Sequence, residues 1–154
     1  MVTLVGTQKD FSEALANLIE LDFAAAASYQ EAIECVKSST LRAKLREFKD
    51  DHQRHIQECG DLLHKMGMEP PTSAGIKQIF TQGKILFAHL MGDKVILKAL
   101  ESNEEDTVVA YERLNTHPGK TEDASEILAR GLTDEQRQQA WLEQTIEELD
   151  TPYV

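Results

Sequence analysis

Two histidines three residues apart are the part of the sequence best suited to bind a metal ion. His52 and His55 lie in the segment DDHQRHIQ, residues 50–57, whose surroundings have the apolar periodicity of an amphipathic helix. Residues three apart lie on the same side of a helix, so the two imidazoles face the same way. Phe48 and Cys59 continue their apolar series. The spacing therefore predicts that both histidines face the protein interior.

Polar residues also interrupt the apolar faces of three other predicted helices. Asp22 replaces an apolar residue in the first helix and Glu104 does so in the third, whereas Glu135 and Gln138 share a face with Leu142 in the last. Burying such groups without partners costs several kcal/mol each. Either a closed hydrogen-bond network or a bound divalent cation can compensate. The candidate metal ligands are Asp22, His52, His55, Glu104, Glu135 and Gln138.

The elements that must position these residues are four long helices. The capping pattern DFSE at Asp10 begins the first, and glycine or proline follows the second and third. A long connection separates the second helix from the third. The sequence therefore predicts an all-α four-helix bundle with a crossover between helices 2 and 3, in one domain spanning residues 1–154. The expected helices cover about 11–37, 40–66, 94–115 and 122–149.

Two details of this arrangement are less regular. The apolar segment 76–91 is expected to form a short extra helix on the crossover, which covers one end of the bundle and contributes to a homodimer contact. A bundle face is the alternative contact. In the last helix, Gly131 can introduce a break.

The first and third helices resemble each other in sequence. Asp22 precedes Tyr29 by seven residues, as Glu104 precedes Tyr111, which suggests two helical hairpins related by duplication. The two tyrosines either donate hydrogen bonds to the carboxylates or pack in the core with their hydroxyls satisfied elsewhere.

Composition excludes several classes of partner. With 27 acidic and 16 basic residues the formal charge is −11, which repels phosphate backbones and makes nucleic acid an unexpected partner. No run of about 18 apolar residues and no signal peptide is present, so no membrane association is expected. Cys35 and Cys59 lack the spacing of a zinc site, and we expect reduced cysteines in a cytoplasmic protein.

The chain resembles the ferritin-like superfamily. The likeness is carried by LANLIELDFAAAASYQEAIE and GDKVILKALESNEEDTVVAYERL, with RHIQE and RQQAWLEQ resembling the ends of the second and fourth ligand helices. It is most similar to an uncharacterised bacterial branch of these bundles, described as a domain of unknown function. Di-iron bundles of this superfamily carry a carboxylate on helices 1 and 3 and Glu-x-x-His on helices 2 and 4.

This resemblance implies an altered metal site. Asp22 and Glu104 take the two single-carboxylate positions, whereas His52 replaces a bridging carboxylate and Gln138 replaces a histidine. An imidazole that coordinates through one nitrogen cannot bridge two metals, and an amide oxygen is a poorer ligand for iron or zinc. A single-metal site fits better, built from Asp22, His52 and His55, with or without Glu135. Glu104 and Gln138 would form at most a weak second position.

Two functions remain open from the sequence. The first is a ferritin-like protein that binds iron, zinc or manganese and acts in metal handling or oxidative stress. The second is a non-catalytic stress-related or scaffold bundle that has lost its metal site. The sequence contains no phosphate-binding glycine loop, nucleophile elbow or catalytic cysteine signature, so no catalytic residue is assigned and enzymatic activity stays open.

Overall fold

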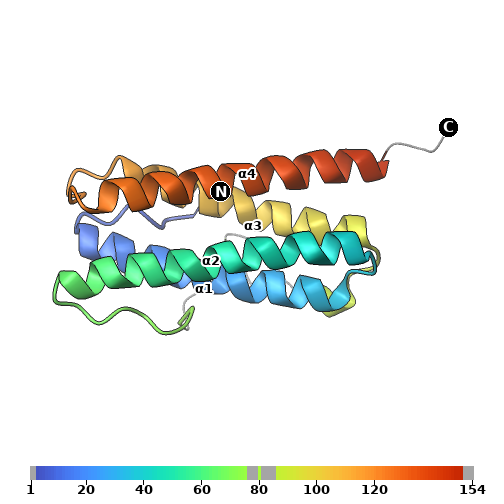
Figure 1. Ribbon diagram of the computed structural model, residues 1–154, viewed down its shortest axis with the longest axis horizontal. Helices are drawn as coiled ribbons and strands as arrows, with labels where there is room; N and C mark the ends of the chain where they lie inside the picture. The colour runs from blue at the N-terminus through green and yellow to red at the C-terminus, as the bar shows by residue number, and fades with distance from the viewer. Residues whose placement is uncertain (1–2, 76–79, 81–85, 151–154) are drawn as a thin grey trace.

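The computed structural model of the protein, which describes residues 3–75, 80 and 86–150, is a bundle of four long helices lying side by side (Figure 1). No strand occurs within the described residues. The all-α four-helix bundle predicted from the sequence is therefore confirmed. The helices are α1 (Phe11–Cys35), α2 (Ser39–Lys65), α3 (Asp93–Asn115) and α4 (Ala124–Asp150).

The helix starts follow the capping residues in the sequence. The Asp10 carboxylate accepts a hydrogen bond from the Ser12 backbone N–H, and the Ser38 hydroxyl accepts one from that of Leu41. Such caps satisfy backbone donors that have no partner inside the helix. Because α1 and α2 are separated by only three residues, they form an antiparallel hairpin, and α3 and α4 form a second one (Figure 1).

The crossover between the hairpins runs from the end of α2 to the start of α3. Of the expected extra helix at 76–91, residues 76–79 and 81–85 lie outside the described part of the chain. The part that is described contains a single 3-10 turn, η1 (Phe87–His89), in place of an α-helix, and the Phe87 ring is buried. Leu86 and Met91 are exposed. The homodimer contact through this segment stays a prediction.

The last helix differs from expectation at Gly131. We expected a possible break there, but α4 is continuous through this residue. A lone glycine weakens a helix by only about 1 kcal/mol relative to alanine, which tertiary packing can offset. At Gly131 this packing is the contact with the buried ring of Tyr111, which is described with the polar centre below.

Two apolar clusters fill the bundle, one toward each end. One contains the first half of α1 and α4 with the second half of α2 and α3, including Leu15, Leu63 and Leu128. The other contains the remaining halves, including Phe48 and Leu97. A polar layer lies between them at mid-height. In the described part of the chain, no helix has the length and apolar character needed to cross a membrane.

Candidate metal centre

The polar layer brings four potential metal ligands together. Asp22, His52, His55 and Glu135 each offer a ligand atom, and these atoms lie within 4.8 Å of one another. Their exposed fractions are 1%, 0%, 3% and 0%, respectively. They come from α1, α2 and α4, and each follows the inward apolar series of its helix. A group of two imidazoles and two carboxylates in this arrangement can hold a divalent metal ion.

Asp22 is the best-connected member of the group. His52 Nδ1 donates a hydrogen bond to Asp22 Oδ1 over 2.8 Å, and the Tyr111 hydroxyl donates to Oδ2 over 2.6 Å. His55 Nδ1 lies 3.4 Å from Oδ1. Burial alone would raise the pKa of Asp22, but the two imidazoles beside it hold that pKa below its usual value. Asp22 is therefore a carboxylate.

Glu135 is the least satisfied member. Its Oε1 lies 3.2 Å from His55 Nδ1 and 3.4 Å from His52 Nδ1, without the alignment of a hydrogen bond. Both Glu135 oxygens and His55 Nδ1 are buried with no hydrogen-bond partner. Buried polar atoms are rarely left this way, and a bound ion commonly satisfies such atoms. All three atoms belong to residues of the same group of four.

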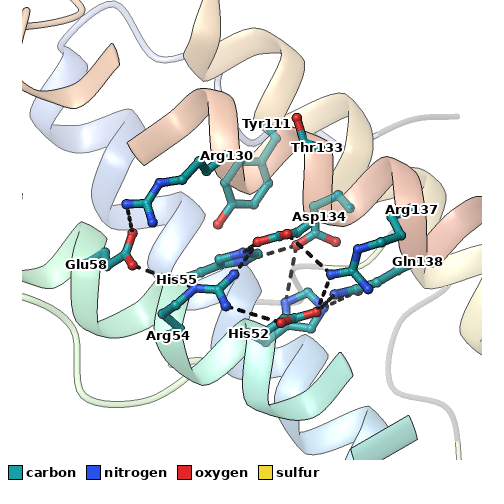
Figure 2. A network of polar contacts seen from close by, with 12 residues as sticks. His52, Arg54, His55, Glu58, Tyr111, Arg130, Thr133, Asp134, Arg137 and Gln138 are labelled. Atoms are coloured by element: carbon teal, nitrogen blue, oxygen red, sulfur yellow. Dashed lines mark hydrogen bonds and ion pairs between the residues drawn. The ribbon is translucent and has the colours of Figure 1, made fainter. Parts of the chain in front are cut away.

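The outer nitrogens of both histidines are held by polar groups (Figure 2). His52 Nε2 donates to Gln138 Oε1 over 3.1 Å, and His55 Nε2 donates to Asp134 Oδ2 over 2.9 Å. The Gln138 amide nitrogen in turn donates to Asp51 Oδ2 over 3.1 Å. Such contacts fix the ring orientation of a metal-binding histidine. Both Nδ1 atoms are thereby directed toward Asp22 and Glu135.

Gln138 was predicted to be a weak ligand, and its place in the structure suggests a different contribution. Its oxygen accepts the His52 Nε2–H, and the amide is fully buried. Ligation by Gln138 stays a prediction, whereas its contact with the outer side of His52 is part of the observed geometry.

Glu104 is buried near the centre but is not part of the group of four. Its carboxyl group accepts hydrogen bonds from the Tyr29 hydroxyl over 2.8 Å and from Thr107 Oγ1 over 3.2 Å. Burial raises the pKa of Glu104 well above its usual value, and the nearby negative charge of Glu135 adds to this effect. This shift favours the protonated form of Glu104, and its role as a ligand stays a prediction.

The charges of the central group balance without metal. Burial lowers the pKa of both histidines, but Glu135 and Asp22 outweigh this for His52 and raise its pKa. For His55, the contact of its Nε2 with Asp134 and the nearby Asp22 and Glu135 carboxylates outweigh burial and raise the pKa to about 12. Burial raises the pKa of Glu135, yet the His52 charge holds it below its usual value. These shifts favour two imidazolium cations facing two carboxylates.

Sequence reasoning missed a ring of four charged residues beside this centre, made of Asp51, Arg54, Asp134 and Arg137. Arg54 forms ion pairs with Asp51 over 3.3 Å and with Asp134, whereas Arg137 pairs with Asp51 over 2.7 Å and with Asp134 over 3.3 Å (Figure 2). The two aspartates are half-buried, whereas the two arginines are exposed. Burial raises the pKa of Asp134, but His55 and the two arginines outweigh this and lower it to about 2.

The four-residue ring repeats a short pattern that could have been found in the sequence. The segment DHQRH at residues 51–55 corresponds to DEQRQ at 134–138, an offset of 83 residues. Asp22 and Tyr29 correspond to Glu104 and Tyr111 at an offset of 82. This second repeat agrees with the duplication expected from α1 and α3.

The sequence left open whether the hydroxyls of Tyr29 and Tyr111 donate hydrogen bonds to the carboxylates or are satisfied elsewhere. The Tyr29 hydroxyl on α1 donates a hydrogen bond to Glu104 on α3, and the Tyr111 hydroxyl on α3 donates one to Asp22 on α1. Both rings are also fully buried. Hydrogen bonding to the carboxylates is therefore what the structure shows. The exchange between α1 and α3 links the two hairpins at the centre.

Gly131 provides the space for one of these tyrosines. A Cβ atom added to Gly131 would lie 2.4 Å from Tyr111 Cε1. Substitution Gly131→Ala is expected to lower the free energy of unfolding by about 1–3 kcal/mol, because the enlarged side chain displaces a buried ring that is also hydrogen-bonded to Asp22. Urea denaturation followed by circular dichroism measures this change.

Gly60 gives a matched control within a helix. An added Cβ there would meet only Pro70, at an ordinary 3.7 Å. Gly60→Ala is expected to leave stability unchanged or to raise it by up to about 1 kcal/mol, because alanine favours helix more than glycine does. Equal effects of the two substitutions would contradict the proposed packing of Tyr111 on Gly131.

Comparison with known proteins identifies a family but no activity. A family model described as a domain of unknown function (DUF2383) matches residues 10–116. A solved structure described as a conserved hypothetical protein, rv2844, from Mycobacterium tuberculosis is similar over 94% of both chains, with 14% identity and a TM-score of 0.74. At that identity the likeness shows the fold alone. No curated protein matches this chain.

Proposed function

The chain belongs to the DUF2383 family, and we propose that its buried centre binds one divalent metal ion through Asp22, His52, His55 and Glu135. The observation that carries this proposal is the set of unpartnered atoms, both Glu135 oxygens and His55 Nδ1, which belong to the same group of potential ligands. A cation bound there would give each of them a partner.

The donor set favours transition metals over calcium or magnesium. Two imidazole nitrogens and two carboxylate oxygens suit iron, zinc or manganese, whereas magnesium and calcium prefer oxygen alone. The metal-ligating residues also balance the ion's charge, because two carboxylates and two neutral imidazoles carry a total charge of −2. A divalent ion can therefore replace two bound protons with no change in net charge.

We further propose a ferritin-like ancestry, with a role in metal handling or oxidative stress. The carboxylate and histidine positions on four helices, and the repeat that relates the two hairpins, support it. The contacts of Gln138 with His52 and of Glu104 with Tyr29 favour a single metal position over a pair.

Metal analysis tests this proposal directly. The purified protein, and the protein incubated with Fe(II), Zn(II) or Mn(II) and then desalted, is expected to contain about one metal ion per chain by elemental analysis. Absence of metal under all of these conditions would rule out the site. Stopped-flow oxidation of added Fe(II) then tests for redox activity, and a rate no faster than that in buffer excludes it.

The alternative function is a bundle that uses its polar centre for structure alone. The contacts of Asp22 with His52 and Tyr111, and the equal numbers of opposite charges, favour it, because they stabilise the centre without an ion. This alternative leaves both Glu135 oxygens without an aligned hydrogen bond, since the histidines contact only Oε1, and only as ion pairs.

A further inference from the structure

The α2–α4 seam differs from the other three contacts between neighbouring helices. These two helices make the fewest close backbone approaches among the four neighbouring pairs in the described part of the chain. Charged side chains bridge the gap. Arg130 pairs with Glu58 over 2.9 Å, Arg54 pairs with Asp134, and Arg137 pairs with Asp51 over 2.7 Å.

These bridging arginines can move more easily than an apolar core. The side chains of Arg54, Arg130 and Arg137 are 44%, 54% and 47% exposed. Exposed ion pairs contribute little to stability, and exposed side chains change rotamer within nanoseconds. The seam can therefore open locally without unfolding the bundle.

A surface hollow lies at this seam, next to the candidate centre. Its volume is about 490 Å³, and Asp134 and Arg54 form part of its wall together with Glu126, Ala129, Arg130 and Thr133. Asp134 Oδ2 also contacts His55 Nε2 over 2.9 Å. One carboxylate thus touches both the hollow and a candidate metal ligand (Figure 2).

The exposed fractions of the four candidate ligands also indicate the α2–α4 seam as the side nearest to solvent. His55 is 3% exposed, whereas the other three are 0% or 1% exposed. His55 is therefore the member of the group nearest to solvent. Its outer nitrogen faces Asp134 on α4, and its inner nitrogen faces the centre.

We propose that the α2–α4 seam is the route by which a divalent cation reaches the buried centre. The hydrated cation enters the hollow, and the Asp134 carboxylate attracts it there. Arg54 swings away from Asp134 toward solvent, and the cation passes His55 to reach Asp22 and Glu135. The proposal rests on the metal site proposed above and adds the path to it.

Two substitutions with opposite expected effects test this route, using Co(II) as the probe. Ala129→Trp fills the hollow and is expected to slow Co(II) uptake about tenfold or more, since the path is blocked. Arg54→Gln removes the cation that opposes the incoming ion and is expected to speed uptake severalfold. Stopped-flow absorbance of bound Co(II) measures the rate, and equilibrium titration measures the affinity.

Matched controls separate the route from general effects. Ala43 on α2 is exposed and does not line the hollow, so Ala43→Trp is expected to keep the wild-type rate. Lys98 on α3 is also exposed, and Lys98→Gln makes the same charge change as Arg54→Gln away from the seam. The equilibrium affinity is expected to stay within about threefold of wild type in Ala129→Trp.

The uptake rates distinguish failure of the proposed route from failure of the proposed metal site. Slow uptake in Ala129→Trp with fast uptake in Arg54→Gln supports the route. Wild-type rates in both variants, or equal changes in their controls, overturn it while leaving the metal site intact. If Ala129→Trp fails to fold, the comparison of Arg54→Gln with Lys98→Gln decides. If the wild type binds neither Co(II) nor any of Fe(II), Zn(II) and Mn(II), the metal site fails and the route fails with it.

Discussion

Replacing His52 and His55 together with leucine is expected to abolish divalent metal binding and the stabilisation that bound metal gives. The two rings supply both nitrogen ligands, and their Nδ1 atoms lie 3.4 Å and 3.2 Å from the same Glu135 oxygen. A ligand that binds only the folded state raises the free energy of unfolding by about 2.7 kcal/mol at a hundred times its dissociation constant. The double variant is expected to lose all of this increment.

Thermal unfolding with and without Zn(II) measures the effect, with a matched pair of histidines as the control. His64 and His89 are both exposed and lie outside the group of four. A His64→Leu/His89→Leu variant is expected to keep the metal-dependent rise in melting temperature. The structural alternative predicts the same melting temperature with and without metal in every variant, the wild type included.

The metal-free stability of the double variant carries separate information. Leucine removes both cations that face Asp22 and Glu135, so two buried carboxylates lose their partners. Breaking a buried ion pair by removing one partner typically costs about 3–5 kcal/mol. We therefore expect lower metal-free stability as well, and the metal-dependent increment must be read relative to that lower baseline.

The inward direction of the central residues could be predicted because it depends on periodicity within one helix. His52 and His55 follow the apolar series that contains Phe48 and Cys59, and the structure buries all four. The same reasoning placed Asp22 on the inner face of α1. Local spacing therefore carries this information without any knowledge of neighbouring helices.

The separation of Glu104 from the ligand group was expected from the family resemblance, which left Glu104 and Gln138 at most a weak second position, and not from periodicity within one helix. Glu104 and Glu135 both lie on inward faces, and both are buried. What distinguishes them is the neighbour that each side chain contacts, since Glu104 lies against Tyr29 of α1 and Glu135 lies against the histidines of α2. Such contacts arise from side-chain packing across the bundle and leave no periodic signal in one helix.

The four-residue ring of Asp51, Arg54, Asp134 and Arg137 was missed for a different reason. Charged residues at the edge of an amphipathic face are most often solvated, so single positions gave no signal. The repeat of Asp-x-Gln-Arg at residues 51–54 and 134–137 was available in the sequence. Comparison of the two hairpins at an offset of 83 residues would have paired these positions across the seam.

Metal affinity is expected to rise steeply with pH, because the ion competes with protons for the two histidines. The pKa of His55 is raised to about 12, and that of His52 is also raised by Glu135 and Asp22. These shifts favour the protonated form of both imidazoles before metal binds, and each must lose its Nδ1 proton to bind a metal. Binding is expected to release about two protons, so affinity changes up to about a hundredfold per pH unit.

Isothermal titration in two buffers with different ionisation enthalpies counts the released protons between about pH 5 and pH 8. Without metal, the folding stability changes with pH in the opposite direction to the metal affinity. A histidine whose folded pKa is raised stabilises the fold fully below its unfolded pKa of 6.5, and this contribution is lost as pH rises toward 12. Raising the pH therefore weakens the metal-free fold while strengthening metal binding. A pH-independent affinity with no proton release would show that the histidines are not ligands.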